Sequence, residues 1–258
     1  MDDIRRPAAT AVREASAGRP EPAPRPRGLV DLRGRERAPA LLVYPADAVL
    51  VVSGLPGGGK STLIRRWSGA APVVDPRDAH EDCAAVMPAW LPYAVYRPWA
   101  RLVHARRLWN AVRAGGPLLV HDCGSRAWPR RLLAREAGRR GRELHLVLLD
   151  VTAADALAGQ EARGRWTRPR VFDRHRRGLR RLLDALAAPG AGGPGGGPVP
   201  EAASVVLLDR TTREHVAAVA FRRRREEGRP AGPVERACPE SVTGPGCAPR
   251  SGSRRRHR

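Results

Sequence analysis

The chain has 258 residues, of which 42% are hydrophobic, and a formal net charge of +21 at pH 7. This length permits one large domain or two small ones, and the hydrophobic fraction is enough for a sizeable core. No apolar run is long enough to span a membrane, which excludes a protein built on transmembrane helices. The cysteines, Cys83, Cys123, Cys238 and Cys247, form no CxxC pair or metal-ligand cluster. We therefore expect no zinc site or disulfide framework, and a cytoplasmic protein with reduced thiols.

The two ends of the chain differ in composition from its middle. Residues 1–40 and 222–258 are rich in Pro, Gly and Arg and show little apolar periodicity, which predicts disordered tails. Residues 41–221 then form a single domain, which contains a flexible Gly- and Pro-rich linker at 189–200.

Apolar runs and helical periods alternate along this domain. In chain order we expect a strand at 48–53, a helix from Gly59 through Trp67, a strand at 71–75, and an amphipathic helix that ends at Gly115 and Gly116. The next expected elements are a strand at 117–122, a helix at 127–138 and a strand at 143–150. They are followed by helices at 153–162 and about 171–186, a strand at 203–209 and a short final helix. The first amphipathic helix should carry Trp99, Leu102, Val103, Trp109 and Val112 on one face. This order predicts a three-layer α/β fold with a mainly parallel five-stranded sheet and helices on both faces.

The high positive charge has two interpretations. A pI near 11.6 indicates attraction to polyanions such as nucleic acid, nucleotides or an acidic membrane surface. A chain whose basic residues are all arginine except Lys60, and which is rich in Ala, Gly and Pro, is also typical of GC-rich coding. Both interpretations stay open.

The stretch GLPGGGKS at 54–61 fits the pattern G-x-x-x-x-G-K-[ST] and lies between a buried strand and a helix, where that pattern binds phosphate. Its glycines allow successive N–H groups to point at phosphate oxygens, and the following helix adds its positive dipole end. The predicted nucleotide-binding residues are Gly54, Leu55, Pro56, Gly57, Gly58, Gly59, Lys60, Ser61 and Thr62. The hydroxyl of Ser61 is expected on a Mg²⁺ ion that bridges the outer phosphates.

Lys60 is the only lysine in the sequence. A lysine places a compact charge on a flexible stem, whereas the wide planar guanidinium of arginine would not fit inside the curled loop. We therefore expect Lys60 to reach the terminal phosphates of a nucleotide.

Two carboxylates end neighbouring predicted strands, Asp75 in VVDPRDAH and Asp122 in LLVHDCG. Ligands of open α/β sheets lie outside the carboxyl ends of the strands, so either carboxylate could accept a proton from an attacking hydroxyl or hold the metal and its waters. Asp75 could instead be a turn residue before Pro76, and Asp122 a helix N-cap or loop carboxylate.

Arg163, Arg165, Arg168 and Arg170 lie in a segment at 163–170 between two predicted helices. Such a segment could close over the phosphates as a lid, because a transferring phosphoryl group needs cations around it. The alternative is a solvated basic loop.

Three stretches of the chain together resemble the P-loop kinases related to the bacteriophage polynucleotide kinase domain, a group often labelled AAA-type ATPases. They are VVSGLPGGGKSTL, VVDPRD and the stretch from LLVHDCG to RHRRGLRRL. Zeta toxins and small-molecule phosphotransferases are near relatives of that group. The resemblance covers roughly residues 47–187.

This resemblance implies transfer of the ATP γ-phosphate to a hydroxyl, with Mg²⁺. It implies that Lys60 and Ser61 contact phosphate and Mg²⁺ and that Asp75 is the general base. It also implies that Arg77 or Asp78 lies in the acceptor segment, that Asp122 is a substrate-side carboxylate, and that Arg163, Arg165 or Arg168 belongs to the lid. The position of Asp122 at a strand end separately makes it a candidate Mg²⁺ ligand with Ser61. Polynucleotide kinases carry an arginine three residues after the base, where this chain has Asp78. That departure disfavours a polynucleotide acceptor.

Trp90, Tyr93 and Tyr96 in MPAWLPYAVYRPW could wall an acceptor site or could simply pack a proline-rich connection. His104, His121 and His145 are expected to be structural or surface residues. We expect a phosphotransferase that moves the γ-phosphate of ATP to a small-molecule hydroxyl or a nucleic-acid 5′-end. The alternative is an ATP-binding regulatory module that associates with nucleic acid through its basic tails.

Overall fold

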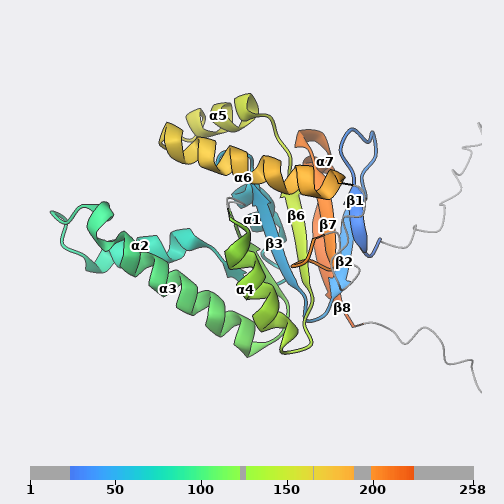
Figure 1. Cartoon of the computed structure of the whole chain (residues 1–258), viewed down its shortest axis with the longest axis horizontal. Coiled ribbons are helices and arrows are strands. Elements are labelled where there is room, and N and C mark those ends of the chain that lie inside the picture. Colours follow the sequence, from blue (N-terminus) through green and yellow to red (C-terminus); the bar gives the residue numbers. More distant parts are fainter. Residues whose placement is uncertain (1–23, 123–125, 165, 189–198, 224–258) are drawn as a thin grey trace, which may run out of the picture. The chain divides into compact units, whose positions relative to one another are not determined.

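The structure is a computed structural model that describes residues 24–122, 126–164, 166–188 and 199–223 (Figure 1). Most of both expected tails, residues 189–198 of the expected linker and Arg165 of the expected lid lie outside the described residues.

A parallel six-stranded sheet forms the centre of the described fold. Its order is β1-β7-β6-β3-β5-β4, and every neighbouring pair is parallel. The strands are β1 (Gly28–Asp31), β3 (Val49–Gly54), β4 (Val73–Val74), β5 (Leu118–His121), β6 (Leu144–Leu149) and β7 (Ser204–Leu208). The five predicted strands are confirmed as β3 to β7.

The prediction of five strands is wrong by one, because β1 adds an edge strand next to β7. This strand, GLVD, lies within residues 1–40, which the composition predicted to be disordered. Four residues between arginine-rich segments carry too short a pattern to signal a strand, and only pairing with Ser204–Leu207 of β7 determines its conformation.

The sheet buries both faces, as expected for parallel strands that read as continuous apolar runs. Alternate residues point to opposite sides, so Val49 and Val51 join one hydrophobic cluster and Leu50 and Val52 the other. The first cluster includes residues of α3 (Tyr93–Ala114), α4 (Ala127–Gly138), α5 (Ala153–Glu161) and α6 (Pro169–Ala187).

The second face carries α1 (Lys60–Trp67), whose Leu63, Ile64 and Trp67 are buried there. Much of its remaining cover is a separate parallel pair of strands, β2 (Leu41–Pro45) and β8 (Ala218–Arg222), together with the segment after α7 (Arg210–His215). Leu32 and Ala71, from the segments after β1 and α1, also belong to this cluster. The prediction of helices on both faces is therefore confirmed, but a small second sheet shares this face with α1.

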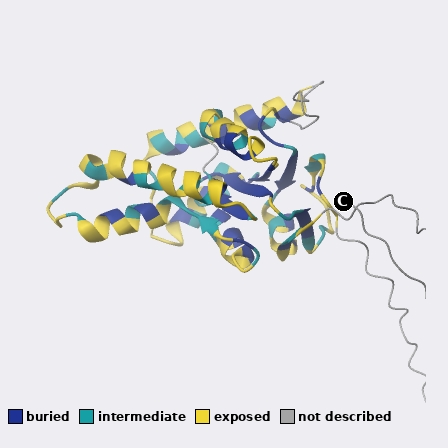
Figure 2. Ribbon diagram, turned by 90° about the horizontal axis from the view of Figure 1, so that it is seen from below, coloured by how far each residue is buried: buried dark blue, intermediate teal, exposed yellow. Residues whose placement is uncertain are grey.

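Helices α2 (Pro76–Val86) and α3 pack against each other beside β4 (Figure 1). The predicted apolar face of α3 is mostly wrong. Trp99, Leu102 and Trp109 are exposed and Val103 is only part-buried, whereas Val112 is buried as expected and Ala100 is buried without having been predicted. Figure 2 shows that much of the helix pair α2 and α3, at the left, is exposed. The helix carries apolar residues on more than one side, so their spacing alone does not determine which side packs against the fold. No helix in the described ranges is long and apolar enough to cross a membrane.

Candidate active site

The predicted phosphate-binding loop joins β3 to α1. Helix α1 begins at Lys60, and its N-cap, Gly59, has left-handed geometry with φ 93° and ψ 3°. No side chain of a described residue caps this N-terminus. The first N–H groups of a helix have no partner within the helix and carry its positive dipole end, so this terminus is suited to bind an anion.

Neighbouring helices press on the loop and require two of its glycines. Gly57 has φ 90°, and a Cβ there would overlap the carbonyl oxygen of Ala156 in α5. A Cβ on Gly59 would overlap the guanidinium of Arg213 in α7, whose Nη1 donates to the carbonyl oxygen of Gly58 at 2.9 Å. The loop is therefore held in a curled shape from two sides before any ligand binds.

The ammonium of Lys60 lies inside this curl. The residue is only 4% exposed, and its Nζ donates to the carbonyl oxygens of Gly54 at 2.9 Å and Leu55 at 2.8 Å. A guanidinium is a wide planar fork and has no room to take this position without moving the loop backbone. Ser61, the next residue, lines the adjacent cavity.

Asp75, which follows β4 and is part-buried, pairs with His121, the buried last residue of β5. Asp75 is the N-cap of α2 and accepts a hydrogen bond from the backbone N–H of Arg77 at 2.9 Å. Its Oδ2 lies 2.8 Å from Nδ1 of His121, and the two side chains are 14% and 7% exposed. Burial raises the pKa of Asp75, but the hydrogen bond and charge of His121 and the N–H of Arg77 outweigh burial and lower the pKa overall.

The tautomer of His121 follows from this contact. An ionised carboxylate only accepts hydrogen bonds, so Nδ1 of His121 carries the proton that Asp75 accepts. In a neutral imidazole the other nitrogen, Nε2, is then an acceptor. This Nε2 is buried and has no hydrogen-bond partner among the described residues, and His121 lines the cavity next to the loop. His121, which the sequence suggested to be a structural or surface residue of marginal interest beside Asp122, is therefore a candidate residue of the site.

Asp122 directly follows β5, which pairs with the strand β3 that leads into the loop. Its Oδ2 accepts from Oγ of Ser53, the penultimate residue of β3, at 3.3 Å, and Arg130 Nη1 lies 3.4 Å from the same oxygen. Its side chain is 26% exposed. The predicted alternative of a helix N-cap does not apply, because α4 begins five residues later with Arg126 as its N-cap.

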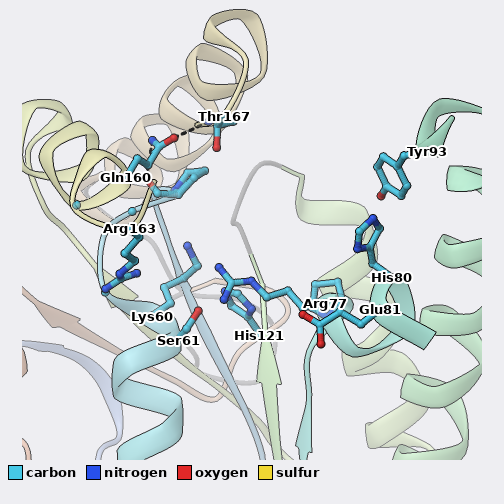
Figure 3. Close-up of a pocket in the computed structure, with 15 residues that line it drawn as sticks. Lys60, Ser61, Arg77, His80, Glu81, Tyr93, His121, Gln160, Arg163 and Thr167 are labelled. Carbon is cyan, nitrogen blue, oxygen red and sulfur yellow. Dashed lines mark hydrogen bonds between the residues drawn. The ribbon is translucent and has the colours of Figure 1, made fainter. Parts of the chain in front are cut away.

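A cavity of about 560 Å³ lies between the loop and α2 (Figure 3). One wall consists of the phosphate-binding loop, the end of α5 and the segment before α6. The other wall consists of α2, the start of α3 and the end of β5. Lys60, Arg77 and Arg163 bring three positive charges to the lining, against the one carboxylate of Glu81. The cavity is therefore suited to a polyphosphate.

The segment between α5 and α6 is tied to the loop. Gln160, which is 4% exposed, donates from Nε2 to the carbonyl oxygen of Pro56 at 3.1 Å and accepts from the N–H of Thr167 at 2.7 Å (Figure 3). Arg163 donates from Nη2 to Thr62 Oγ1 at 3.2 Å and lines the cavity. Arg168 is exposed and does not line it, and Arg165 lies outside the described residues.

The structure thus brings only some of the predicted residues to the cavity. Those that line it are Pro56, Gly57, Gly59, Lys60, Ser61, Arg77, Tyr93 and Arg163. Gly54, Leu55, Gly58 and Thr62 belong to the loop or to α1 but do not line the cavity. Neither predicted carboxylate, Asp75 or Asp122, lines the cavity, and neither does Asp78, Trp90 or Tyr96. Asp75 is linked to the cavity through His121.

Sequence reasoning missed several lining residues, chiefly His80, Glu81, His121, Gln160 and Thr167. His80 and Glu81 follow Arg77 by three and four positions, which places them on the same side of α2. That spacing could have identified them. The ring of His80 packs edge-on against Tyr93, with centroids 4.3 Å apart and planes at 83°. A single glutamine in a helix carries no comparable signal.

The residues present fit a nucleotide with its magnesium ion. No three His, Cys, Asp or Glu side chains in the described ranges gather into a metal cluster. Mg²⁺ needs none, because it usually keeps several waters and takes one or two protein oxygens plus substrate phosphates. Ser61 offers a hydroxyl oxygen in the cavity, and Asp122 offers a carboxylate at the end of the strand next to the loop strand.

No family model and no curated protein matches the sequence. Among solved structures, the chain is similar to a gluconokinase from Sinorhizobium meliloti, with 18% identity over 67% of this chain and 91% of that chain and a TM-score of 0.38. It is also similar to a tunicamycin resistance protein from Deinococcus radiodurans (21% identity, 52% of this chain, 80% of that chain, TM-score 0.39). A structure of the PezAT toxin–antitoxin system of Streptococcus pneumoniae shows 13% identity over 70% of this chain and 72% of that chain, with a TM-score of 0.46.

Proposed function

We propose that the protein is an ATP-dependent phosphotransferase that moves the γ-phosphate of ATP to a hydroxyl group of a small molecule. The observation that carries this proposal is a single cavity with two different walls. One wall has an uncapped helix N-terminus with Lys60 and Ser61, and the other has the imidazole of His121, held by Asp75. A phosphate donor and a hydroxyl acceptor need these two environments side by side.

The loop side binds the donor. The N–H groups at the start of α1 would hold the β- and γ-phosphates, and Lys60 and Arg163 would neutralise negative charge on them. Ser61 and Asp122 would hold Mg²⁺, which supplies electrostatic stabilisation of the phosphate oxygens when bound. Lys60 would exchange its hydrogen bonds to the carbonyl oxygens of Gly54 and Leu55 for contacts with phosphate.

The facing wall supplies the proton acceptor. Both oxygens of Asp75 are engaged, one by the N–H of Arg77 and the other by His121, so we assign the base to Nε2 of His121 and a positioning role to Asp75. The acceptor hydroxyl oxygen attacks the γ-phosphorus, the bond from that phosphorus to the β,γ-bridging oxygen breaks, and ADP leaves with the bond electrons. The hydroxyl proton passes to Nε2, and Asp75 stabilises the resulting imidazolium.

The acceptor wall favours a small molecule without phosphate. Its lining includes His80, Glu81 and Tyr93, and the carboxylate of Glu81 would repel an acceptor phosphate and accept hydrogen bonds from hydroxyls. Asp78 stands where polynucleotide kinases carry an arginine, and it does not line the cavity. Arg77 does line it and is the one cation among the described residues of this wall.

An acceptor screen with γ-labelled ATP and Mg²⁺ tests this function. We expect label on one class of small alcohols, such as sugars, nucleosides or aminocyclitols, and none on an oligonucleotide with a free 5′-hydroxyl. The Lys60→Ala variant should transfer no label. Release of label to water alone, with every acceptor present, would contradict the proposal and favour the regulatory ATPase alternative.

A further inference from the structure

A second cavity, of about 750 Å³, lies at the amino ends of the sheet strands, opposite to the phosphate-binding loop. It is lined by residues that precede β3, β5, β6 and β7, among them Asp47, Gly116, Glu143 and Ala203, and by the end of β2. The six residues of β3, about 20 Å along the strand, separate these amino ends from the phosphate-binding loop. The two cavities share no lining residue.

Four arginines converge on this second cavity from the two ends of the described chain. Arg25 and Arg27 come from the segment before β1, Arg222 is the last residue of β8, and Arg223 follows it. Backbone pairing holds both segments in place, since the N–H of Val43 donates to the carbonyl oxygen of Pro24 at 3.1 Å and β8 pairs with β2. The side chains of the four arginines form no ion pair or hydrogen bond with a described residue.

The wall behind these arginines is rigid. Arg142 is buried and donates to the carbonyl oxygens of Asp47, Val112 and Gly116, two of which belong to lining residues. It therefore fixes the turn before β3 and the turn before β5 in one position. Asp47 and Glu143 are the only carboxylates among the described lining residues, so the arginines outnumber them two to one.

Two buried polar atoms of lining residues lack partners within the described part of the chain. The hydroxyl of Tyr44 and Nε2 of His145 make no hydrogen bond there, although Tyr44 is 1% exposed and His145 is 3% exposed. Their rings pack with centroids 5.1 Å apart, and Nδ1 of His145 lies 2.8 Å from Oγ of Ser204. Glu143 Oε2 is 3.6 Å from Nε2, too far for a hydrogen bond. Buried polar groups normally have partners. Water does not reach either atom in this structure, so a ligand that enters more deeply than water would supply the missing partners.

We propose that this second cavity binds a small phosphorylated molecule, with the phosphate among the four arginines and a hydroxyl or ring nitrogen against Tyr44 and His145. The volume lies within the range of small-molecule sites, and guanidinium groups match phosphate geometry. Burial raises the pKa of the Tyr44 hydroxyl and lowers the pKa of His145 to about 4. Both groups are therefore neutral at pH 7 and suited to the uncharged part of the ligand.

Calorimetry on the full chain tests this second site. The Lys60→Ala variant is used as background, so that phosphates do not bind at the P-loop. The probes are orthophosphate, glucose 6-phosphate, adenosine 5′-monophosphate and unphosphorylated glucose. We expect one-site binding of at least one of the two organic phosphates, weaker binding of orthophosphate, and none of glucose. These arms also distinguish a sugar phosphate from a nucleotide as the source of the phosphate.

Variants connect this binding to the cavity. The double change Arg27→Ala and Arg222→Ala should weaken binding about tenfold or more, because each removes a charge-assisted hydrogen bond. The matched change Arg174→Ala and Arg177→Ala removes two exposed arginines of α6, and it should leave affinity within about twofold. Tyr44→Phe removes only a hydroxyl and should weaken the organic phosphate more than orthophosphate.

The proposal would be overturned if both double arginine variants lost affinity for the probes equally. It would also be overturned if the protein bound an oligonucleotide but none of the small probes. Either result would instead indicate diffuse attraction to polyanions. No binding of any phosphate would also overturn it. Unchanged affinity in Tyr44→Phe would overturn the assignment of Tyr44. Circular dichroism and thermal unfolding of each variant show whether it is folded, so that a loss of binding is not mistaken for a loss of structure.

Discussion

The pair formed by Asp75 and His121 is the residue-scale feature on which the proposed chemistry depends. Each residue constrains the other: the carboxylate selects the tautomer of the imidazole, and the imidazole takes one of the two carboxylate oxygens. The sequence indicated that Asp75 would lie near the ligand, because it ends a strand of a parallel sheet. It could not indicate the partner, because His121 lies 46 positions away and only the pairing of β4 with β5 brings the two together.

Substituting this pair should lower turnover without lowering nucleotide affinity. Asp75→Asn replaces an acceptor by an amide that no longer stabilises the imidazolium, and His121→Gln removes the base. We expect kcat to fall about 10²-fold to 10⁴-fold in each, with the KM for ATP little changed. The double variant should be hardly slower than either single variant, because residues that act as a unit are not additive.

His215→Gln is the matched control, since His215 is exposed on α7 and does not line the cavity. Steady-state kinetics with the acceptor found in the screen gives kcat and KM separately. Strong loss in Asp75→Asn with normal turnover in His121→Gln would contradict our assignment and make Asp75 itself the base.

At the scale of elements, Gln160 joins three segments that the sequence predicted separately. Its amide bridges the phosphate-binding loop at Pro56 and the segment before α6 at Thr167, and α5 carries it. The run of arginines at 163–170 indicated a basic segment near the phosphates, and Arg163 does line the cavity. The link itself was not predictable, because it depends on how closely α5 approaches the glycines of the loop.

Gln160→Ala should loosen this link. It leaves the N–H of Thr167 and the carbonyl oxygen of Pro56 without their partner, which costs about 1–3 kcal/mol of stability for buried groups. We also expect a several-fold higher KM for ATP, because the loop and Arg163 lose a common support. Thermal unfolding and steady-state kinetics measure both effects.

Glu161→Ala, at the exposed neighbouring position, is the control. If both variants behave like the unmodified protein, Gln160 has no role in holding the segment against the loop.

The short strands illustrate a different limit of the sequence. The five strands of the expected sheet were predictable because continuous apolar runs buried on both faces are typical of parallel sheets. Strands β2 and β8 pair residues 41–45 with residues 218–222, so their conformation depends on a contact between the two ends of the domain. No local pattern contains that contact.

At the scale of the whole molecule, two hydrophobic clusters on opposite faces of the sheet stabilise the fold, and buried histidines make its stability depend on pH. Burial lowers the pKa of His145 from 6.5 to about 4 and also lowers the pKa of His104. The folded chain therefore disfavours the proton that the unfolded chain binds below about pH 6.5. Stability should rise with pH across this window, since the unfolded state binds more protons there.

We expect the free energy of unfolding to fall by about 3 kcal/mol from His145 alone as the pH drops from 6.5 to 4. Below that window, carboxyl groups whose pKa is lowered in the fold, such as Asp75 and Asp209, should add to the loss. Urea unfolding at pH 7.0 and 4.5 measures the change. His145→Gln should reduce the difference between the two pH values, and His215→Gln should keep it. Equal stability of the unmodified protein at both pH values would show that His145 is not buried in its neutral form.

The most direct measurement is calorimetry of ATP with Mg²⁺ against the unmodified chain, the Lys60→Arg variant and the control Arg101→Ala, which removes an exposed arginine of α3. We predict one-site binding by the unmodified chain and by Arg101→Ala. In Lys60→Arg, affinity should fall at least about tenfold although the charge is kept, because a guanidinium does not fit within the curled loop. Undiminished binding by Lys60→Arg, or no binding by the folded unmodified chain, would contradict the view that this loop is built to hold a triphosphate.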